Sequence, residues 1–230
     1  YASYKFAYII SVNSKLEKWA MQKLHCKQVE FLNNFSFFNH LEKETILKGI
    51  KGKRIVHIAA FRPQKNHLNL LKSFVQIKSS HPDWTLHLIG DGKEYMHNQI
   101  IDFIEKNKLG KNVFLYGVCS DIKYILSQSS IGVLSSKSEG LPIALLEYGL
   151  AKLPVVVTNV GECNSVVKNN VSGFVVPKSD PSKLSKSLMD LIKNDEVKSQ
   201  FGEELYLEVK NNYSKESYLN KLTKIYKEVL

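Results

Sequence analysis

The sequence predicts an α/β fold in which a parallel β-sheet is covered by helices on both faces. From Lys53 onward, short β-rich runs alternate with helical stretches, which is the order expected of a parallel sheet. The strand candidates are continuous apolar runs, as strands buried on both faces are, and not polar–apolar alternations. The chain also has 230 residues with 43% hydrophobic content, which is enough to bury one sizeable core.

The expected elements of this region are bounded by turn-forming residues. The expected strands are 54–61, 84–90, 112–117, 131–136, 154–158 and 173–176. The helices between them are expected at 66–79, 93–107, 122–128 and 142–151. In the first helix, apolar residues recur at three- and four-residue steps at Leu68, Leu71 and Val75, and segment 81–83 breaks it. Two long amphipathic helical stretches, divided near Tyr213, are expected to finish the chain.

The first fifty residues depart from this pattern. The expected elements there are a strand at 6–12, a helix at 14–24, a strand at 29–32 and a polar helix at 39–48. Ser14 is expected to cap the first of these helices. Because the chain also begins without Met, we interpret it as part of a longer protein. The expected units are 1–50, the end of a preceding domain plus a linker; 51–212, the main domain; and 213–230, a helix packing back toward residues 1–38.

Composition narrows the class of protein and its surroundings. Charged residues make up 23% of the chain, as in ordinary globular domains, and no run of 18 apolar residues predicts a membrane-spanning helix. The cysteines, Cys26, Cys119 and Cys163, have no metal-binding spacing, so a reducing cytoplasm fits best. The net charge of +10 is concentrated in residues 51–168, with 15 basic and 9 acidic side chains. This excess suits an anionic small ligand or a membrane-facing surface better than nucleic acid, for which no motif is present.

Chemically distinctive residues follow four of the expected strands. They lie in the segments 61–67, 90–92, 116–121 and 135–142. Ligands of open parallel sheets bind at the carboxyl ends of the strands, so these segments are expected to share one edge. Gly90 and Asp91, after the second of these strands, are expected to contribute to the binding site.

The segment SEGLPIALLE, residues 138–147, combines a helix start with two carboxylates. Pro142 suits the first turn of a helix, so the free N–H groups after Gly140 and Leu141 form a phosphate site. Because carboxylates repel phosphate, Glu139 and Glu147 are expected to bind hydroxyl groups on either side of it. A nucleotide sugar has this order of ribose, diphosphate and hexose. The alternative is a helix whose two acids are incidental.

Two cations follow the first strand of the main domain. Lys65 precedes a helix, where it can neutralise a diphosphate, and Arg62 can bind the same group through two hydrogen bonds. The alternative is that both are ordinary solvated surface residues. The +6 excess of this region favours the first interpretation.

Five ordered motifs together resemble the donor-binding half of glycosyltransferase family 4. They are AAFRPQKNHLNLL, LHLIGDG, NVFLYGV, SEGLPIALLEYGLAKLPVVVTNVGECNSVV and SGFVV, and they cover residues 54–176. Glu139 and Glu147 match the family's E-x7-E signature. The resemblance implies a GT-B fold, in which two Rossmann-like domains face each other across a cleft, with this chain supplying one of them.

The resemblance also implies roles for residues of this chain. Glu147 would bind the ribose of the nucleotide and Glu139 the transferred sugar, while Lys65 would neutralise the diphosphate leaving group. Backbone N–H groups near Gly140 and Leu141 would contact phosphate or sugar, although Pro142 itself has none to donate. The residues implied for the base pocket are Tyr116, Gly117 and Val118.

Two positions depart from the family pattern. Ala59 and Ala60 replace its usual Gly-Arg pair, and we expect Arg62 to substitute for the missing arginine. Residues 162–165 replace its usual Gly, Pro and Glu, so the resemblance does not define the loop on the sugar side. Cys163 is expected near the donor.

The function expected from the sequence is retaining transfer of a sugar from a nucleotide-sugar donor, most simply a UDP-sugar. The acceptor would be a glycan or a lipid-linked sugar in surface polysaccharide synthesis. No metal or other cofactor is expected, and the whole protein is expected in the cytoplasm, at the inner face of a membrane. The alternatives are a non-catalytic nucleotide-sugar binding module and another GT-B enzyme such as a sugar epimerase. A nicotinamide dehydrogenase is disfavoured because no GxGxxG follows a strand.

Overall fold

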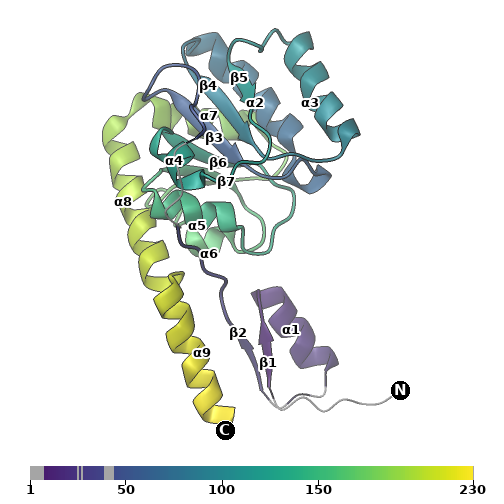
Figure 1. The fold of residues 1–230 in the computed structure, drawn as a ribbon, viewed down its shortest axis with the longest axis vertical. Helices are drawn as coiled ribbons and strands as arrows, with labels where there is room; N and C mark the ends of the chain where they lie inside the picture. Colours follow the sequence, from purple (N-terminus) through teal and green to yellow (C-terminus); the bar gives the residue numbers. More distant parts are fainter. Residues whose placement is uncertain (1–7, 25, 27, 39–43, 230) are drawn as a thin grey trace.

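The computed structural model describes residues 8–24, 26, 28–38 and 44–229. Within them the chain forms a six-stranded parallel sheet in the order β5-β4-β3-β6-β7-β8 and a small parallel pair, β1-β2. Figure 1 shows the large sheet with its helices as one body, and the pair β1-β2 below it. This confirms the predicted α/β fold with a parallel sheet flanked by helices.

The six expected strands of the main domain are all present, each shorter than expected. The strands are β3 (Arg54–Ile58), β4 (Thr85–Ile89), β5 (Val113–Leu115), β6 (Ile131–Leu134), β7 (Val155–Thr158) and β8 (Phe174–Val176). Two of them end early because the next residues turn away from the sheet. Gly90 and Gly117 have positive φ angles of 135° and 69°, a region that favours glycine.

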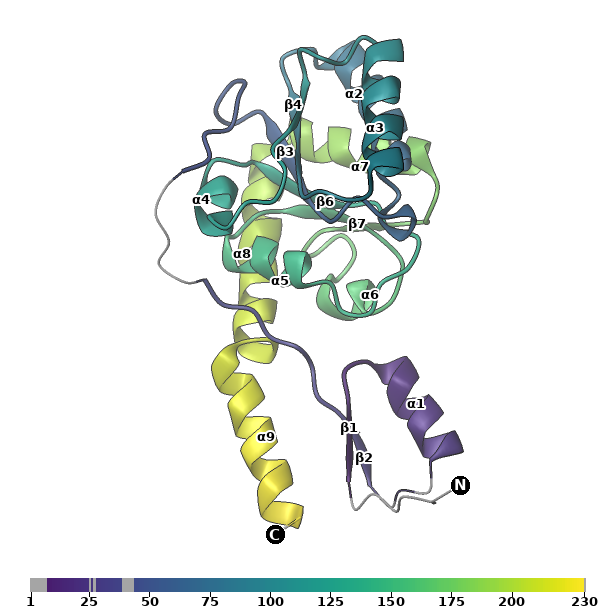
Figure 2. The ribbon, with the colours of Figure 1, turned by 45° about the vertical axis from the view of Figure 1, so that its right-hand side comes forward.

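Helices cover both faces of the large sheet, as Figure 2 shows from a second side. The helices are α2 (His67–Ser80), α3 (Glu94–Lys106), α4 (Ile122–Ser127), α5 (Ile143–Leu150), α6 (Cys163–Val166), α7 (Pro181–Lys193), α8 (Asp195–Asn212) and α9 (Lys215–Val229). Apolar residues of α2, α3 and α7, with Phe201 of α8, form one core cluster against the sheet, and those of α4, α5, α6 and the rest of α8 form the other. Successive strand residues alternate between them, since Ile55 lies in the first cluster and Val56 in the second.

The C-terminal region has one helix more than expected. The sequence predicted two long stretches divided near Tyr213, but the structure also ends a helix, α7, at Lys193. The Asn194 side chain accepts a hydrogen bond from the N–H of Val197 at 3.0 Å and so caps α8. The four-residue helix α6 was not predicted either.

The N-terminal unit consists of β1 (Ile9–Ser11), α1 (Ser14–Lys23) and β2 (Val29–Phe31). These elements match the expected strand, helix and strand, but the expected cap is wrong. Asn13 is the cap, because its side chain accepts a hydrogen bond from the N–H of Leu16 at 2.8 Å. Ser14 is the first helical residue and binds a distant carboxylate instead.

The expected helix at 39–48 is wrong for residues 44–48, which are irregular, while residues 39–43 lie outside the described chain. The physical reason is that side chains of the main domain bind this backbone. Asp121 accepts hydrogen bonds from the N–H and the hydroxyl of Thr45 at 2.7 and 2.9 Å, and Gln128 donates to the Thr45 carbonyl at 2.8 Å. These groups are therefore not available for the hydrogen bonds of a helix.

The last helix, α9, runs beside the segment that follows β2, as both ribbon views show (Figures 1 and 2). The rings of Phe35 and Tyr218 lie 4.8 Å apart between centroids, and the ammonium of Lys215 lies 5.6 Å from the centroid of the Phe37 ring. These contacts connect the end of the chain to residues 28–38. The division of the chain into domains stays a prediction.

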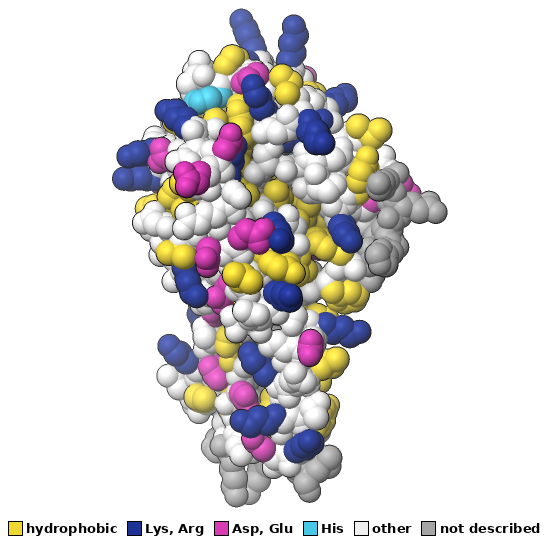
Figure 3. Space-filling view, turned by 90° about the vertical axis from the view of Figure 1, so that its left-hand side faces the viewer, with side chains coloured by type: hydrophobic (Ala, Val, Ile, Leu, Met, Phe, Trp, Pro, Cys, Tyr) yellow, Lys and Arg dark blue, Asp and Glu magenta, His cyan; other side chains and the backbone are white. Residues whose placement is uncertain are grey.

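Charged side chains of both signs are interspersed on the face shown in Figure 3, with hydrophobic side chains between them. The positive excess of the sequence therefore does not gather into a single basic patch on this face. None of the helices in the described part of the chain is both long and apolar enough to cross a membrane.

Candidate functional site

The carboxyl ends of β3, β4, β5 and β6 meet at one edge of the sheet, as predicted. Beyond the strands, isolated bridges join Phe61 to Gly92 and Gly90 to Gly117. A Cβ atom on Gly90 would lie 2.3 Å from the Ala59 carbonyl oxygen, so only glycine permits this close approach of the two loops. The loops after the first three of these strands thus form one continuous rim.

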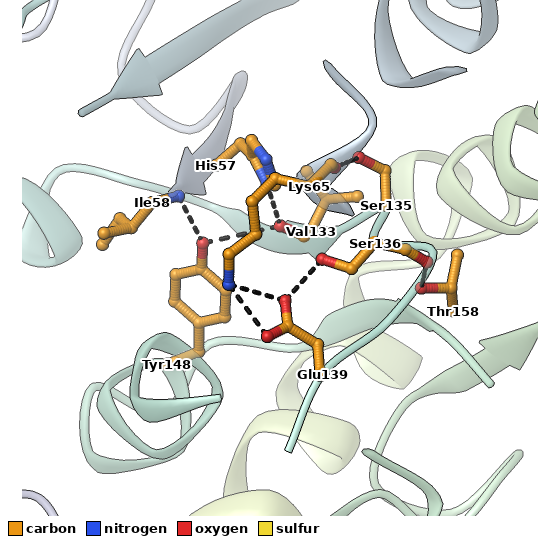
Figure 4. Close-up of polar contacts among 9 residues, drawn as sticks. All are labelled: His57, Ile58, Lys65, Val133, Ser135, Ser136, Glu139, Tyr148 and Thr158. Atoms are coloured by element: carbon orange, nitrogen blue, oxygen red, sulfur yellow. Dashed lines mark hydrogen bonds and ion pairs between the residues drawn. The ribbon is translucent and has the colours of Figure 1, made fainter. Parts of the chain in front are cut away.

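Lys65 and Glu139, which the sequence placed at this edge, are in direct contact. The Lys65 ammonium lies 2.7 and 2.9 Å from the two carboxylate oxygens, and the Ser136 hydroxyl donates to Oε1 at 2.5 Å (Figure 4). The Glu139 side chain is only 8% exposed and that of Lys65 22%. Because both charges are largely shielded from water, each depends on the other for compensation.

Hydrogen bonds between loops hold this pair in place. The Ser135 hydroxyl donates to the Lys65 carbonyl at 3.0 Å, and the N–H of Lys137 donates to the Gln64 carbonyl at 2.7 Å. The Thr158 hydroxyl donates to the Ser136 carbonyl at 2.7 Å, which adds the end of β7 (Figure 4). The site therefore rests on three strands that are distant in sequence.

Glu147 lies in the middle of α5 in different surroundings. Its side chain is half-buried, and no hydrogen-bond or ion-pair partner for it is present among the residues that the structure describes. Burial raises the pKa of its carboxyl above the usual value. A shielded carboxylate without a partner can accept hydrogen bonds from ligand hydroxyls, which would offset the loss of hydration.

The start of α5 leaves backbone N–H groups free of side-chain caps. Pro142 is the N-cap residue and no side-chain cap is formed. A Cβ atom on Gly161 would lie 2.3 Å from the Glu139 carbonyl oxygen, and the N–H of Glu162 donates to the Gly140 carbonyl at 2.8 Å. The loop after β7 is therefore packed against the backbone that leads into α5, and the helix N-terminus has the polarity that favours an anion.

A cleft of about 850 Å³ separates this edge from the N-terminal unit. One wall consists of residues 137–140 and 159–162, and the other of residues 13–16 with Trp19. Glu162 joins the walls, because its Oε1 accepts hydrogen bonds from the N–H and the hydroxyl of Ser14 at 3.1 and 2.5 Å.

The family model of the group 1 glycosyl transferases matches residues 38–207. The chain belongs to the group 1 glycosyltransferases. This confirms the predicted resemblance at that level, while the narrower label of family 4 stays a prediction.

Curated relatives of this glycosyltransferase chain include named enzymes. It is 35% identical to an Escherichia coli UDP-Gal:alpha-D-GlcNAc-diphosphoundecaprenol alpha-1,3-galactosyltransferase over 60% of this chain and 36% of that protein. It is 24% identical to a Staphylococcus aureus poly(ribitol-phosphate) alpha-N-acetylglucosaminyltransferase over 84% of this chain and 39% of that protein. A Methanocaldococcus jannaschii glycosyltransferase without an assigned substrate is 28% identical over 84% of this chain and 53% of that protein. The chain thus spans about half the length, or less, of the curated relatives it matches.

Solved structures confirm the fold. A structure of HepE from Anabaena in complex with UDP and glucose superposes with a TM-score of 0.85 at 16% identity, over 96% of this chain and 63% of that one. A mutant of TarM from S. aureus in complex with UDP, alpha-GlcNAc-glycerol and fondaparinux superposes with a TM-score of 0.82 at 21% identity. The match covers 95% of this chain and 43% of that one. The group 1 chain therefore has the predicted Rossmann-like architecture of GT-B glycosyltransferases.

Other predicted site residues of the glycosyltransferase lie farther out on the rim. The Arg62 side chain is exposed and has no hydrogen-bond or ion-pair partner among the described residues, although the Arg62 carbonyl accepts a hydrogen bond from the N–H of Lys65 at 2.9 Å. Asp91 is also exposed, and its Oδ1 accepts a hydrogen bond from the N–H of Gly92 at 2.7 Å. The Val118 side chain is 84% exposed.

Tyr116 uses its hydroxyl within the protein. The hydroxyl accepts a hydrogen bond from the N–H of Lys48 at 2.9 Å and lies 3.0 Å from Nδ1 of His87. The Tyr116 hydroxyl therefore connects the linker, at Lys48, to the residue that follows β5. The predicted base pocket would have to use the ring face or the backbone of residues 116–118.

Sequence reasoning missed two residues that position the site. Ser136 contacts Glu139 directly, and Tyr148 is fully buried, with its hydroxyl accepting a hydrogen bond from the N–H of Ile58 at 2.8 Å (Figure 4). Burial raises the pKa of the Tyr148 hydroxyl, so it stays protonated. A tyrosine next to the second glutamate of the motif was the available signal, but its contact with β3 was not visible in the sequence.

The unusual segment 162–165 has a structural explanation. Burial alone would raise the pKa of Glu162, but hydrogen bonds from Ser14 and Ser165 hold it below its usual value. Cys163 is fully buried, and burial raises its pKa to about 12, so the thiol stays neutral. No group of three His, Cys, Asp or Glu side chains in the described part of the chain is arranged to hold a metal ion.

Proposed function

We propose that this chain is the donor-binding part of a retaining glycosyltransferase that uses a UDP-sugar. The observation that carries the proposal is the shielded Lys65–Glu139 pair beside the uncapped start of α5, with the partnerless Glu147 on the same helix. Further support comes from the E. coli relative, whose name specifies UDP-Gal, and from the HepE structure, which contains UDP and glucose.

Each group has a role that its surroundings favour. Glu147 accepts hydrogen bonds from the ribose hydroxyls, which gives its half-buried carboxylate the partners it lacks. The start of α5, with the backbone of Gly140 and Leu141, faces the diphosphate. Gly90 and Asp91, with residues 116–118, line the side of the base.

The transfer step needs stabilisation of the departing diphosphate. As the bond between the sugar and the phosphate breaks, negative charge grows on the leaving oxygen. The ammonium of Lys65, which Glu139 already holds in place, stabilises that charge, and a cation preorganised in this way lowers the barrier; the guanidinium of Arg62 adds a second positive charge. Glu139 then remains beside the sugar, positioned by Ser136. We propose that these groups do the charge work without a resident metal ion.

The proposed acceptor is a glycan or a lipid-linked sugar of a surface polysaccharide. Named relatives act on a diphosphoundecaprenol-linked GlcNAc and on poly(ribitol-phosphate), which supports this class of acceptor. We further propose that the whole protein works in the cytoplasm, at the inner face of the membrane.

Titration of the chain with UDP, ADP and GDP by calorimetry tests the donor site. We expect UDP to bind most tightly, and Lys65→Ala to weaken it about tenfold or more through the lost charge-assisted contact. Lys72→Ala, on the exposed surface of α2, is the matched control and should leave the affinity unchanged. Failure of all three nucleotides to bind would overturn the donor assignment. If no metal ion is needed, addition of EDTA should not change UDP affinity. The anomeric configuration of the product formed by the full-length enzyme shows whether transfer retains the configuration of the donor.

A further inference from the structure

The cleft between the donor edge and α1 has an unbalanced charge. Its carboxylates are already engaged, Glu139 by Lys65 and Glu162 by Ser14 and Ser165. Its lysines are not, since Lys15, Lys137 and Lys178 line the cleft and have no ion-pair partner in the described chain. Among the described residues, the cleft therefore presents three unpaired lysine charges against the single carboxylate charge of Glu162, whose serine partners are neutral, and its lining is positive on balance.

These three lysines converge from separate parts of the chain. Lys15 lies in the first turn of α1, Lys137 follows β6, and Lys178 follows β8. The N-terminus of α1 is itself occupied, because Ser14 donates to Glu162. An anion in this cleft would therefore be bound by lysine side chains and not by helix N–H groups.

The wall formed by α1 also exposes apolar surface. Trp19 is 51% exposed and Leu16 45%, and both line the cleft. They are three residues apart on the helix, as neighbours on one face are, and Lys15 is four residues before Trp19. The C–H groups on one face of a sugar ring form an apolar patch that can pack against an indole ring.

We propose that this cleft, with α1 as one of its walls, contains an acceptor subsite for a sugar that carries a phosphate group. The sugar ring packs on Trp19 and Leu16, and the phosphate is bound by Lys15, Lys137 and Lys178. The inference rests on the proposed function, which places the transferred sugar at Glu139 on the opposite wall of the same cleft. The phosphate recognised here is distinct from the donor diphosphate, whose proposed partners are Lys65, Arg62 and the start of α5.

The test uses N-acetylglucosamine 1-phosphate and N-acetylglucosamine as paired probes, titrated into the chain with and without saturating UDP. Trp19 reports binding directly, because the other tryptophan, Trp84, is only 4% exposed. We expect the phosphorylated probe to bind about tenfold more tightly and to change the tryptophan emission, since charge-assisted hydrogen bonds are the stronger class.

The variants separate charge from stacking. Combined replacement of Lys15, Lys137 and Lys178 by Gln should abolish the preference for the phosphorylated probe without changing UDP affinity. Trp19→Ala should weaken both probes and keep the preference, as measured by calorimetry. The charge-matched control replaces Lys72, Lys106 and Lys193 by Gln; none of these lines the cleft, and the preference should persist.

Two further probes distinguish the source of the phosphate, a sugar diphosphate on a short prenyl chain and a ribitol phosphate oligomer. Binding of either probe that is weakened in the triple-lysine variant but not in the charge-matched control supports the subsite and identifies the source.

Equal binding of the paired probes, an unchanged preference in the lysine variant, or an equal loss in the control variant would overturn the subsite. So would a lack of binding by every phosphorylated probe. The UDP titration is scored separately, so failure of the donor site is recognised independently of this result.

Discussion

At the scale of single residues, the two glutamates of the 139–147 segment differ only in their surroundings. Glu139 contacts Lys65 and Ser136, whereas Glu147 has no partner within the described residues. The first carboxylate is stabilised by the protein itself, and the second is available to a ligand. The same side chain therefore has opposite consequences for the stability of the free protein.

We expect Glu139→Gln to lower the free energy of unfolding by about 1–3 kcal/mol, because it removes the charge that compensates a largely shielded lysine. Glu147→Gln should cause no loss and a small gain, because burial disfavours the charged form of that carboxylate. Urea unfolding of the ligand-free chain at pH 7 measures both. A larger loss for Glu147→Gln than for Glu139→Gln would contradict this assignment of partners.

At the scale of elements, the central strands carry buried histidines. His57 lies on β3 and His87 on β4, and His67 is the first residue of α2. Burial lowers their pKa values to about 4, 3 and 2 respectively. Each imidazole is neutral in the folded chain at pH 7, because the surrounding apolar core disfavours its charged form.

Acid should therefore destabilise the fold before the carboxylates titrate. The pKa of each histidine is lower in the folded than in the unfolded state, so the unfolded state binds more protons below pH 6.5. The contribution of these histidines to the free energy of unfolding is complete above the pKa of the unfolded state. It falls as the pH drops toward the pKa values of the folded state. Between pH 7 and pH 5 we expect a loss of about 2 kcal/mol per histidine.

Urea unfolding at both pH values measures this loss. His87→Gln should reduce the pH dependence by about one histidine's share. A wild-type chain equally stable at both pH values would refute the prediction.

At the scale of the whole molecule, contacts distant in sequence position the N-terminal unit against the donor edge. Asp121 holds the linker, Glu162 holds the start of α1, and Tyr218 of α9 contacts Phe35. The width of the cleft depends on these contacts, because the described residues of the covalent connection, 32–38 and 44–53, form no helix or strand. The Glu162 contact crosses the cleft itself.

We expect Glu162→Ala to loosen the N-terminal unit, because it removes both hydrogen bonds to Ser14. Limited proteolysis should then cut the segment 32–48 several-fold faster, while UDP affinity stays unchanged. Glu203→Ala is the matched control, since it breaks an ion pair with Lys152 whose side chains are about half exposed. Equal cleavage of wild type and Glu162→Ala would show that other contacts set the cleft.

Much of the fold could be predicted because its signals are local. A buried parallel strand is an apolar run, and turn residues mark its ends, so all six strands of the large sheet were found. The helix expected at 44–48 failed because Asp121 and Gln128 bind that backbone, an effect that no local pattern contains. Asn194 acts as a cap within what was expected to be one continuous helical stretch.

The candidate site divides in the same way. The sequence by itself determined the order of the six strands of the large sheet, a helix start next to Pro142 and the spacing of Glu139 and Glu147, because each is a property of neighbouring residues. Only the tertiary structure decided which glutamate is engaged, because the lysine that contacts Glu139 lies 74 residues away. It also decided that α1 faces that glutamate across a cleft, through a contact between Ser14 and Glu162 that spans 148 residues.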